Sequence, residues 1–187
     1  TLGLPSIYTD VYEPLWAAIA ASRLPICLHI GSSSKLLRSA PDAPDPVGLT
    51  FVGANSMMAC ADWLFSGVLE RFRTLRIAFS EGGAGWVPYV LERADEVFDN
   101  LGDVLAATRR PRELFAEHMF TCIMRDDVAL ASLDLIGEAN VMWEADYPHE
   151  SGTFPNSRAL LAQSLAATPD AQARRIAEGN ARALFGI

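Results

Sequence analysis

Short apolar runs alternate along this sequence with longer segments whose apolar residues recur at helical spacing. Each apolar run stops at a polar residue or a glycine, which predicts buried β-strands at residues 24–29, 75–79, 118–123 and 140–143. Helices are predicted at residues 12–22, from 55 through 68, at 86–101, after 126, and twice more before the C-terminus. Because a helix follows every strand, the pattern predicts an α/β fold with a parallel sheet and right-handed crossovers.

Two architectures fit this order of elements: an open doubly wound sheet, and part of a (β/α)8 barrel. No phosphate-binding motif of the GxGxxG or GxxxxGK[ST] type follows any predicted strand, which disfavours nucleotide binding. A long loop rich in proline, serine and aspartate is predicted at residues 32–53. The pattern alone leaves the choice between open sheet and barrel undecided.

Composition narrows the class of protein. Half of the 187 residues are apolar, as in a globular domain, and the net charge of −8 argues against a nucleic-acid partner. No apolar run reaches the ~20 residues that span a bilayer. No signal-peptide pattern opens the sequence, so we expect a cytoplasmic protein without a membrane partner. The sequence starts at Thr1 instead of methionine, which leads us to expect that residues precede it.

The cysteines and a group of arginines have plain structural interpretations. Cys27, Cys60 and Cys122 occupy apolar segments without a CxxC pair, so we expect buried free thiols in a reducing compartment. Three arginines cluster in one predicted loop, namely Arg109, Arg110 and Arg112. We interpret that loop as a solvated turn.

Polar side chains gather where the predicted strands end. His29 closes the first strand, Glu81 follows the second, and Asp146 and His149 follow the fourth. The carboxyl ends of parallel strands meet at one edge, where α/β enzymes place their catalytic groups. His29 and Asp146 are therefore candidate ligands of one divalent metal ion, and Asp146 is also a candidate base for a water molecule. One nitrogen and one oxygen donor do not distinguish zinc from manganese or iron.

Each of these residues also has an interpretation without chemistry. His29 alone is typical of a core histidine bonded to a backbone carbonyl, and Asp146 alone suits a turn before proline. Glu81 is as typical of a charge at a helix N-terminus as of a catalytic group. His149 is a candidate for substrate binding, for support of a metal ligand, or for capping its loop. Arg125, after the third strand, is either a helix-start residue or a partner for a substrate carboxylate.

Four segments together resemble the amidohydrolase-related family, in the branch that includes aminocarboxymuconate-semialdehyde decarboxylase. They are PICLHIGSSS (25–34), FSEGGAGWVPYVLERAD (79–95), VMWEADYPHESGTFPNS (141–157) and GNARALFGI (179–187). The resemblance implies a TIM-type (β/α)8 barrel with one divalent metal ion, often zinc. It also implies that His29 is the metal-binding histidine of strand five and that Asp146 is the aspartate of strand eight. The chain would then be the C-terminal half of the barrel, strands 5–8, without its N-terminal half.

Two departures from the family's pattern bear on mechanism. The paired ligands of strand one, His-x-His or Glu-x-His, occur nowhere in this sequence, and Ser80-Glu81-Gly82 replaces the catalytic histidine after strand six. We therefore expect a metal-dependent hydrolase or decarboxylase acting on a small carboxylated or cyclic substrate, with this chain inactive alone. As a half barrel, it is expected to form a homo-oligomer or to pair with the missing half.

Two other functions remain open at this stage. One is a non-catalytic half-barrel module that serves binding or structure. The other is a metal-independent acid–base enzyme on an open sheet that uses Glu81 and Asp146.

Overall fold

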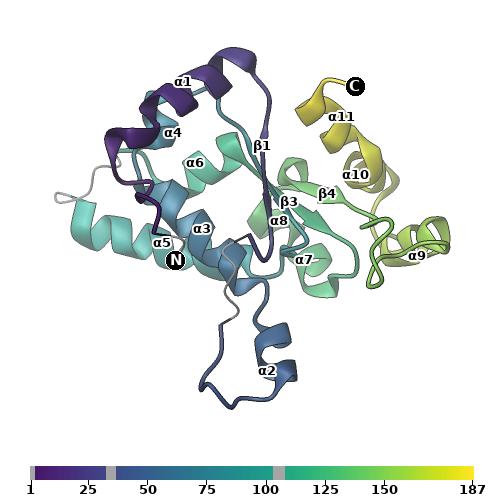
Figure 1. Cartoon of the computed structure of the whole chain (residues 1–187). Helices are drawn as coiled ribbons and strands as arrows, with labels where there is room; N and C mark the ends of the chain where they lie inside the picture. The colour runs from purple at the N-terminus through teal and green to yellow at the C-terminus, as the bar shows by residue number, and fades with distance from the viewer. Residues whose placement is uncertain (1–2, 33–36, 103–107) are drawn as a thin grey trace.

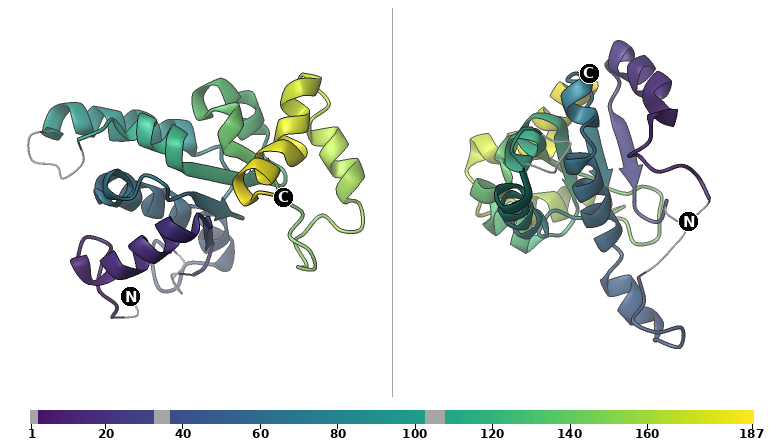
Figure 2. Two further views of the ribbon diagram at one scale, coloured as in Figure 1. Left: turned by 90° about the horizontal axis from the view of Figure 1, so that it is seen from above. Right: turned by 90° about the vertical axis from the view of Figure 1, so that its left-hand side faces the viewer.

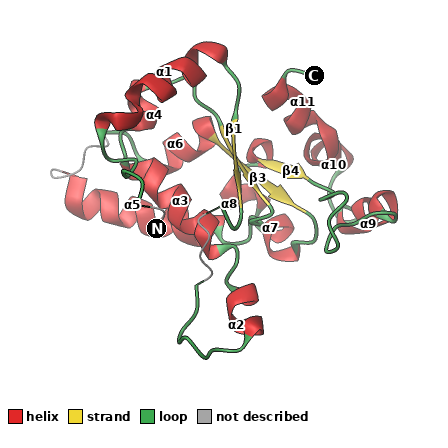
Figure 3. Cartoon of the chain, in the orientation of Figure 1, coloured by secondary structure: helices red, strands yellow, loops and turns green. Residues whose placement is uncertain are grey.

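The computed structural model describes residues 3–32, 37–102 and 108–187. Four strands form one parallel sheet in chain order (Figures 1 and 3): β1 (Ile26–His29), β2 (Ile77–Ser80), β3 (Met119–Ile123) and β4 (Val141–Trp143). This confirms the predicted parallel α/β fold. The strands β1 and β4 form the two edges of the described sheet.

Helices connect successive strands and extend beyond the last one (Figure 2). Before β2 these are a 3-10 turn at Asp10–Tyr12, α1 (Glu13–Ser22), α2 (Asp45–Thr50), α3 (Ala54–Phe65) and α4 (Val68–Arg71). Between β2 and β4 they are α5 (Val87–Leu101), α6 (Pro111–His118), α7 (Asp127–Ala131), α8 (Leu133–Ile136) and a 3-10 turn at Glu138–Asn140. After β4 come α9 (Ser157–Ser164), α10 (Asp170–Arg174), a π-helical turn at Arg175–Gly179 and α11 (Asn180–Phe185).

The two faces of the sheet differ in how they are covered. Side chains alternate along each strand, and Ile77 and Phe79 on one face are fully buried in the main core with residues of α3 and α5. Burial of an apolar side chain of this size stabilises the fold by about 1.5–3 kcal/mol. The other face carries only a small cluster of Ala78, Cys122 and Met142, packed against two residues of α11. The sheet therefore has one closely packed face and one lightly covered face.

The light covering explains an incorrect prediction for one of the cysteines. Cys60 and Cys122 are buried free thiols as predicted, but Cys27 is exposed. Cys27 lies on the edge strand β1, whose side chains alternate between partly buried and exposed positions. An apolar run in the sequence thus marked a strand correctly but did not ensure that both of its faces are buried.

Two helices were missed by the sequence pattern. The helix α2 lies inside the predicted loop 32–53, of which residues 33–36 are outside the described part of the chain. The helix α6 begins at Pro111, so Arg112 is helical rather than part of a turn. Proline near the first helical position favours both helices, because its fixed φ suits the first turn.

The arginine group is paired rather than simply solvated. Arg110 bonds Asp99 at 2.6 Å, Arg112 bonds Asp95 at 3.2 Å, and Arg109 bonds Glu117 at 2.7 Å. The first two pairs connect the start of α6 to α5, and the third connects it to the end of α6. The arginine group therefore has a structural role.

The predicted helix 55–68 is divided in two. From the sequence, Asn55 was a candidate to cap this helix, but Gly53 is the residue that precedes the first turn of α3. The helix ends at Phe65, and Gly67 then adopts a left-handed φ of 71° before α4 starts. Within the described residues, no helix is both long enough and apolar enough to cross a membrane.

Candidate metal centre

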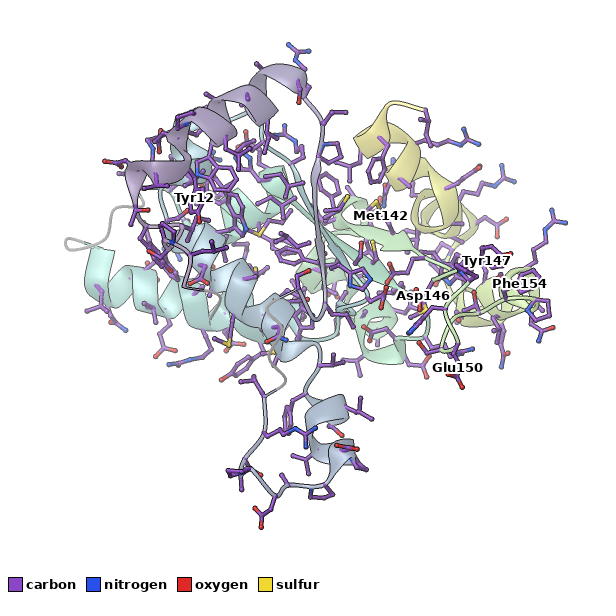
Figure 4. All side chains as sticks on the ribbon, in the orientation of Figure 1. Tyr12, Met142, Asp146, Tyr147, Glu150 and Phe154 are labelled. Atoms are coloured by element: carbon purple, nitrogen blue, oxygen red, sulfur yellow. The ribbon has the colours of Figure 1, made fainter. Side chains whose placement is uncertain are left out.

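The predicted functional residues lie at one edge of the sheet, where the strands end. His29 is the last residue of β1, Glu81 directly follows β2, and Asp146 lies three residues beyond β4. Figure 4 shows Asp146 at the start of the loop that carries Tyr147 and Glu150. The parallel register brings these carboxyl ends together, since His29 is level with Ser80.

His29 is held by both nitrogens of its ring. Its Nδ1 lies 2.6 Å from the carbonyl oxygen of Ile30, and because a carbonyl can only accept, Nδ1 carries a proton. The other nitrogen, Nε2, lies 2.5 Å from Oε1 of Glu81. The bond to the Ile30 carbonyl raises the pKa of His29, and the nearby charges of Glu81 and Asp146 raise it further. A histidine whose Nδ1–H is fixed by a carbonyl presents Nε2 as its ligand atom, as in many metal sites.

Glu81 and Asp146 reach the site through unusual backbone conformations. Glu81 has φ 61° and Asp146 has φ 51°, in the left-handed region that residues other than glycine seldom adopt. Both side chains are mostly buried, with exposed fractions of 12% and 11%. Such strain is characteristic of functional sites.

Asp146 also fixes the second histidine of the site. Its Oδ2 lies 2.7 Å from Nδ1 of His149, whose side chain is 61% exposed. The loop that carries both residues is closed by Thr153, which bonds the carbonyl of Ala145 through both its N–H and its hydroxyl. A Cβ added at Gly152 would lie 2.5 Å from the carbonyl oxygen of Asp146, so the loop requires glycine there.

These contacts create a group with the donor chemistry of a metal site. One ligand atom each from Glu81, Asp146 and His149 lies within 4.8 Å of the others. His29 adjoins the group through Glu81. Two carboxylates and two imidazoles are ordinary ligands of Zn²⁺, Mn²⁺ and Fe²⁺, so the residues fit a divalent ion.

Glu144 is a further carboxyl group at this edge, and sequence reasoning overlooked it. Its Oε1 accepts the backbone N–H of Glu81 at 2.8 Å. Burial raises the pKa of Glu144 to about 7, and the charges of Glu81 and Asp146 add to that shift. The alternation of β4 offered a signal, because Met142 lies on the lightly covered face and Glu144 is two residues further along.

The loop after β2 is held by an aspartate from the next strand connection. Asp126 caps α7, the helix predicted after residue 126, by accepting the N–H of Ala129. The same carboxylate also accepts the N–H groups of Ala84 and Gly85, at 2.7 and 2.9 Å. The glycine-rich loop at residues 82–85 is therefore fixed beside Glu81.

A hollow of about 510 Å³ opens beside Glu81. Its apolar lining includes Phe51, Met57 and Trp86, and Asp126 contributes a second carboxylate. Arg125, the predicted partner of a substrate carboxylate, is exposed and is not among the described residues that line the hollow. The structure thus brings Glu81, Asp146, His149 and His29 together.

Comparison with known proteins identifies the family. The amidohydrolase family profile matches residues 4–187, so the chain belongs to the amidohydrolase family. A 2-amino-3-carboxymuconate-6-semialdehyde decarboxylase of Dictyostelium discoideum is 27% identical over 137 residues, which are 72% of this chain and 37% of that protein.

Solved structures show the same fold over nearly the whole chain. A crystal structure of an amidohydrolase from Mycobacterium avium subsp. paratuberculosis matches with a TM-score of 0.84 at 20% identity, covering 97% of this chain and 47% of that one. A dihydroxybenzoic acid decarboxylase from Polaromonas sp. JS666, solved with bound manganese and the inhibitor 2-nitroresorcinol, matches with a TM-score of 0.71 at 17% identity, covering 98% and 56%. The chain therefore spans about half the length of these structures.

Proposed function

We propose that this chain contributes the metal centre of an amidohydrolase-type enzyme that decarboxylates or hydrolyses a small carboxylated or cyclic substrate. The observation that carries the proposal is the convergence of ligand atoms from Glu81, Asp146 and His149 within 4.8 Å, with His29 beside them. Three neighbouring carboxyl groups, counting Glu144, repel one another, and a divalent cation would offset that repulsion.

The residues divide into ligands and proton carriers. We assign His29, Glu81 and Asp146 as metal ligands, with His149 as a fourth donor or a substrate-binding group. When bound, a divalent ion polarises a substrate oxygen or acidifies a water molecule. Asp146, hydrogen-bonded to the exposed His149, is placed to accept a proton from a bound water molecule.

The hollow beside Glu81 supports a ring-shaped substrate. Phe51, Met57 and Trp86 offer apolar surface to a ring, and no lysine or arginine lies among the described lining residues. A substrate carboxylate would therefore be held at the metal centre instead of by an ion pair in the hollow. The decarboxylases among the similar proteins favour decarboxylation over hydrolysis as the reaction.

Assignment of the strands to the C-terminal half of a barrel is part of the same proposal. The strand-one ligand pair that the family resemblance implies is absent from the sequence. We therefore expect this chain to bind the ion but not to turn over substrate until a partner supplies that pair, whether the other half of the enzyme or another chain.

Metal titration tests the proposal directly. The chain is stripped with a chelator and titrated with Mn²⁺ and Zn²⁺ by calorimetry, and elemental mass spectrometry counts the ions retained. About one equivalent is expected for the wild type. Glu81→Gln should bind at least ~10-fold more weakly. Glu92→Gln, which removes an exposed carboxylate on α5, should match the wild type. Stoichiometric binding that Glu81→Gln leaves unchanged would remove Glu81 from the site, and no binding at all would refute the metal centre.

A further inference from the structure

Glu144 occupies a bridging position between two strand connections. Its backbone N–H still bonds the carbonyl of Ile123 at 3.0 Å, so the ladder between β3 and β4 fixes where its side chain begins. From there the carboxyl group reaches past β3 to the N–H of Glu81, 63 positions earlier in the sequence, at 2.8 Å. The buried thiol of Cys122 adjoins the same carboxyl group.

The bond falls on the residue whose backbone is under strain. A left-handed conformation costs a residue other than glycine or asparagine about 1–2 kcal/mol. Glu81 adopts it at φ 61°, although glycines stand immediately after it and would adopt it freely. This conformation leaves the sheet ladder and directs the carboxylate to within 2.5 Å of His29. The N–H of Glu81 needs an acceptor there, and Glu144 provides it.

Glu144 is not itself among the converging ligand atoms. Within the described residues, the group within 4.8 Å consists of Glu81, Asp146 and His149. The Oε1 of Glu144 is already engaged by the Glu81 N–H. Its contact with the centre therefore runs through the backbone of Glu81.

We infer that Glu144 is a positioning residue that holds Glu81 in its left-handed conformation and so sets the geometry of the metal centre. This inference rests on the proposed function and adds to it a residue that touches no reacting atom. The role depends on an oxygen acceptor and not on a negative charge, so a glutamine at this position can perform it. An alanine cannot.

Three variants test the inference in the full chain. Glu144→Ala removes the acceptor, and Glu144→Gln keeps it while removing the charge. Glu150→Gln removes an exposed charge from the loop after β4 (Figure 4) and serves as the matched control. Each is measured for Mn²⁺ affinity by calorimetry and for hydrogen exchange of the Glu81 amide by NMR without metal, with circular dichroism to verify folding.

The expected pattern separates acceptor from charge. Glu144→Ala should bind Mn²⁺ about 10-fold to 100-fold more weakly, the range for residues that orient a metal ligand. Glu144→Gln and Glu150→Gln should remain within about threefold of the wild type. The Glu81 amide should exchange faster in Glu144→Ala alone. Wild-type affinity in Glu144→Ala would overturn the inference, and so would equal losses in the alanine and glutamine variants, which would indicate a ligand or a charge effect.

The amide measurement distinguishes failure of this inference from failure of the metal proposal. If the wild type binds no Mn²⁺, the metal centre is refuted, but exchange of the Glu81 amide still decides the positioning role. Fast exchange confined to Glu144→Ala would support that role. Equal exchange in all variants, or an unfolded Glu144→Gln, would overturn it.

Discussion

The two ends of the parallel sheet treat their polar side chains in opposite ways. At the amino ends, the residue before each of three strands bonds backbone carbonyls. Arg76 precedes β2 and bonds the carbonyls of Arg73 and Leu75. His118, fully buried before β3, also bonds the carbonyl of Leu75, and Asn140, before β4, bonds three carbonyls. These side chains are anchored within the chain, although Nε2 of His118 is buried without a hydrogen-bond partner among the described residues.

At the carboxyl ends, charged groups face one another instead. Glu81, Glu144 and Asp146 place three carboxyl groups at one edge, and two largely exposed imidazoles adjoin them. Glu81 and Asp146, two of the three described residues other than glycine that have a positive φ, both lie here. The amino end of the sheet thus holds side chains that bond backbone carbonyls, and the carboxyl end gathers the ionisable groups. This is the division known for (β/α)8 enzymes.

The largest expected effect comes from removing one charge at the carboxyl end. Asp146→Asn should weaken Mn²⁺ binding about 100-fold, equivalent to about 2.7 kcal/mol, because a ligand oxygen loses its charge. The free energy of unfolding should not fall, since asparagine tolerates the left-handed conformation and one carboxylate leaves a repelling group. In the assembled enzyme, turnover should be abolished.

Calorimetry and urea denaturation together check this prediction. Asp42→Asn, at an exposed loop position, is the matched control and should change neither quantity. Unchanged Mn²⁺ affinity in Asp146→Asn would remove Asp146 from the metal centre. A large loss of stability would instead assign it a structural role.

The converse change is made at the amino end. Asn140→Ala should lower the free energy of unfolding by about 2–3 kcal/mol, because buried carbonyls lose their donor. The carbonyls concerned belong to Phe115, Ala116 and Met119. Mn²⁺ affinity should stay as in the wild type. Urea denaturation measures the loss, with Asn156→Ala, an exposed asparagine without a capping bond, as control. Equal stabilities of the two variants would contradict the assignment.

This contrast between the ends was predictable from the sequence only in part. Apolar runs located all four strands to within about two residues, and helical spacing located α1 and α5. They succeeded because each of these elements packs apolar side chains into or against the main core. The pattern failed for α6, because its charged residues and proline are also typical of a turn. The ion pairs of its arginines with Asp95 and Asp99 of α5 cannot be read from the local sequence.

The residues of the site were likewise predictable from the sequence only in part. His29, Glu81, Asp146 and His149 were candidates because a strand end can be read from local sequence. Glu144 was missed because its role depends on the N–H of a residue 63 positions away. Neither the left-handed conformation of Glu81 nor the acceptor that it requires can be read from a local pattern.

The smallest expected effect is a pH dependence at the amino end. Burial lowers the pKa of His118 below its ordinary value of 6.5, although the nearby carboxylate of Glu117 opposes the shift. Below pH 6.5 the unfolded chain therefore binds a proton at this position more readily than the folded chain does. The His118 contribution to stability is complete above pH 6.5 and is lost as the pH falls below it.

His118→Asn isolates this contribution, since the asparagine amide can still donate to the carbonyl of Leu75 but does not titrate. The free energy of unfolding should fall less steeply for the variant than for the wild type between pH 6.5 and 5. The raised pKa of His29 stabilises the folded chain as the pH falls through the same range. Only the difference between the two proteins therefore measures the contribution of His118. Parallel pH curves would show that the buried imidazole titrates as it does in the unfolded chain. Burial at the amino end of the sheet would then not hinder protonation of His118.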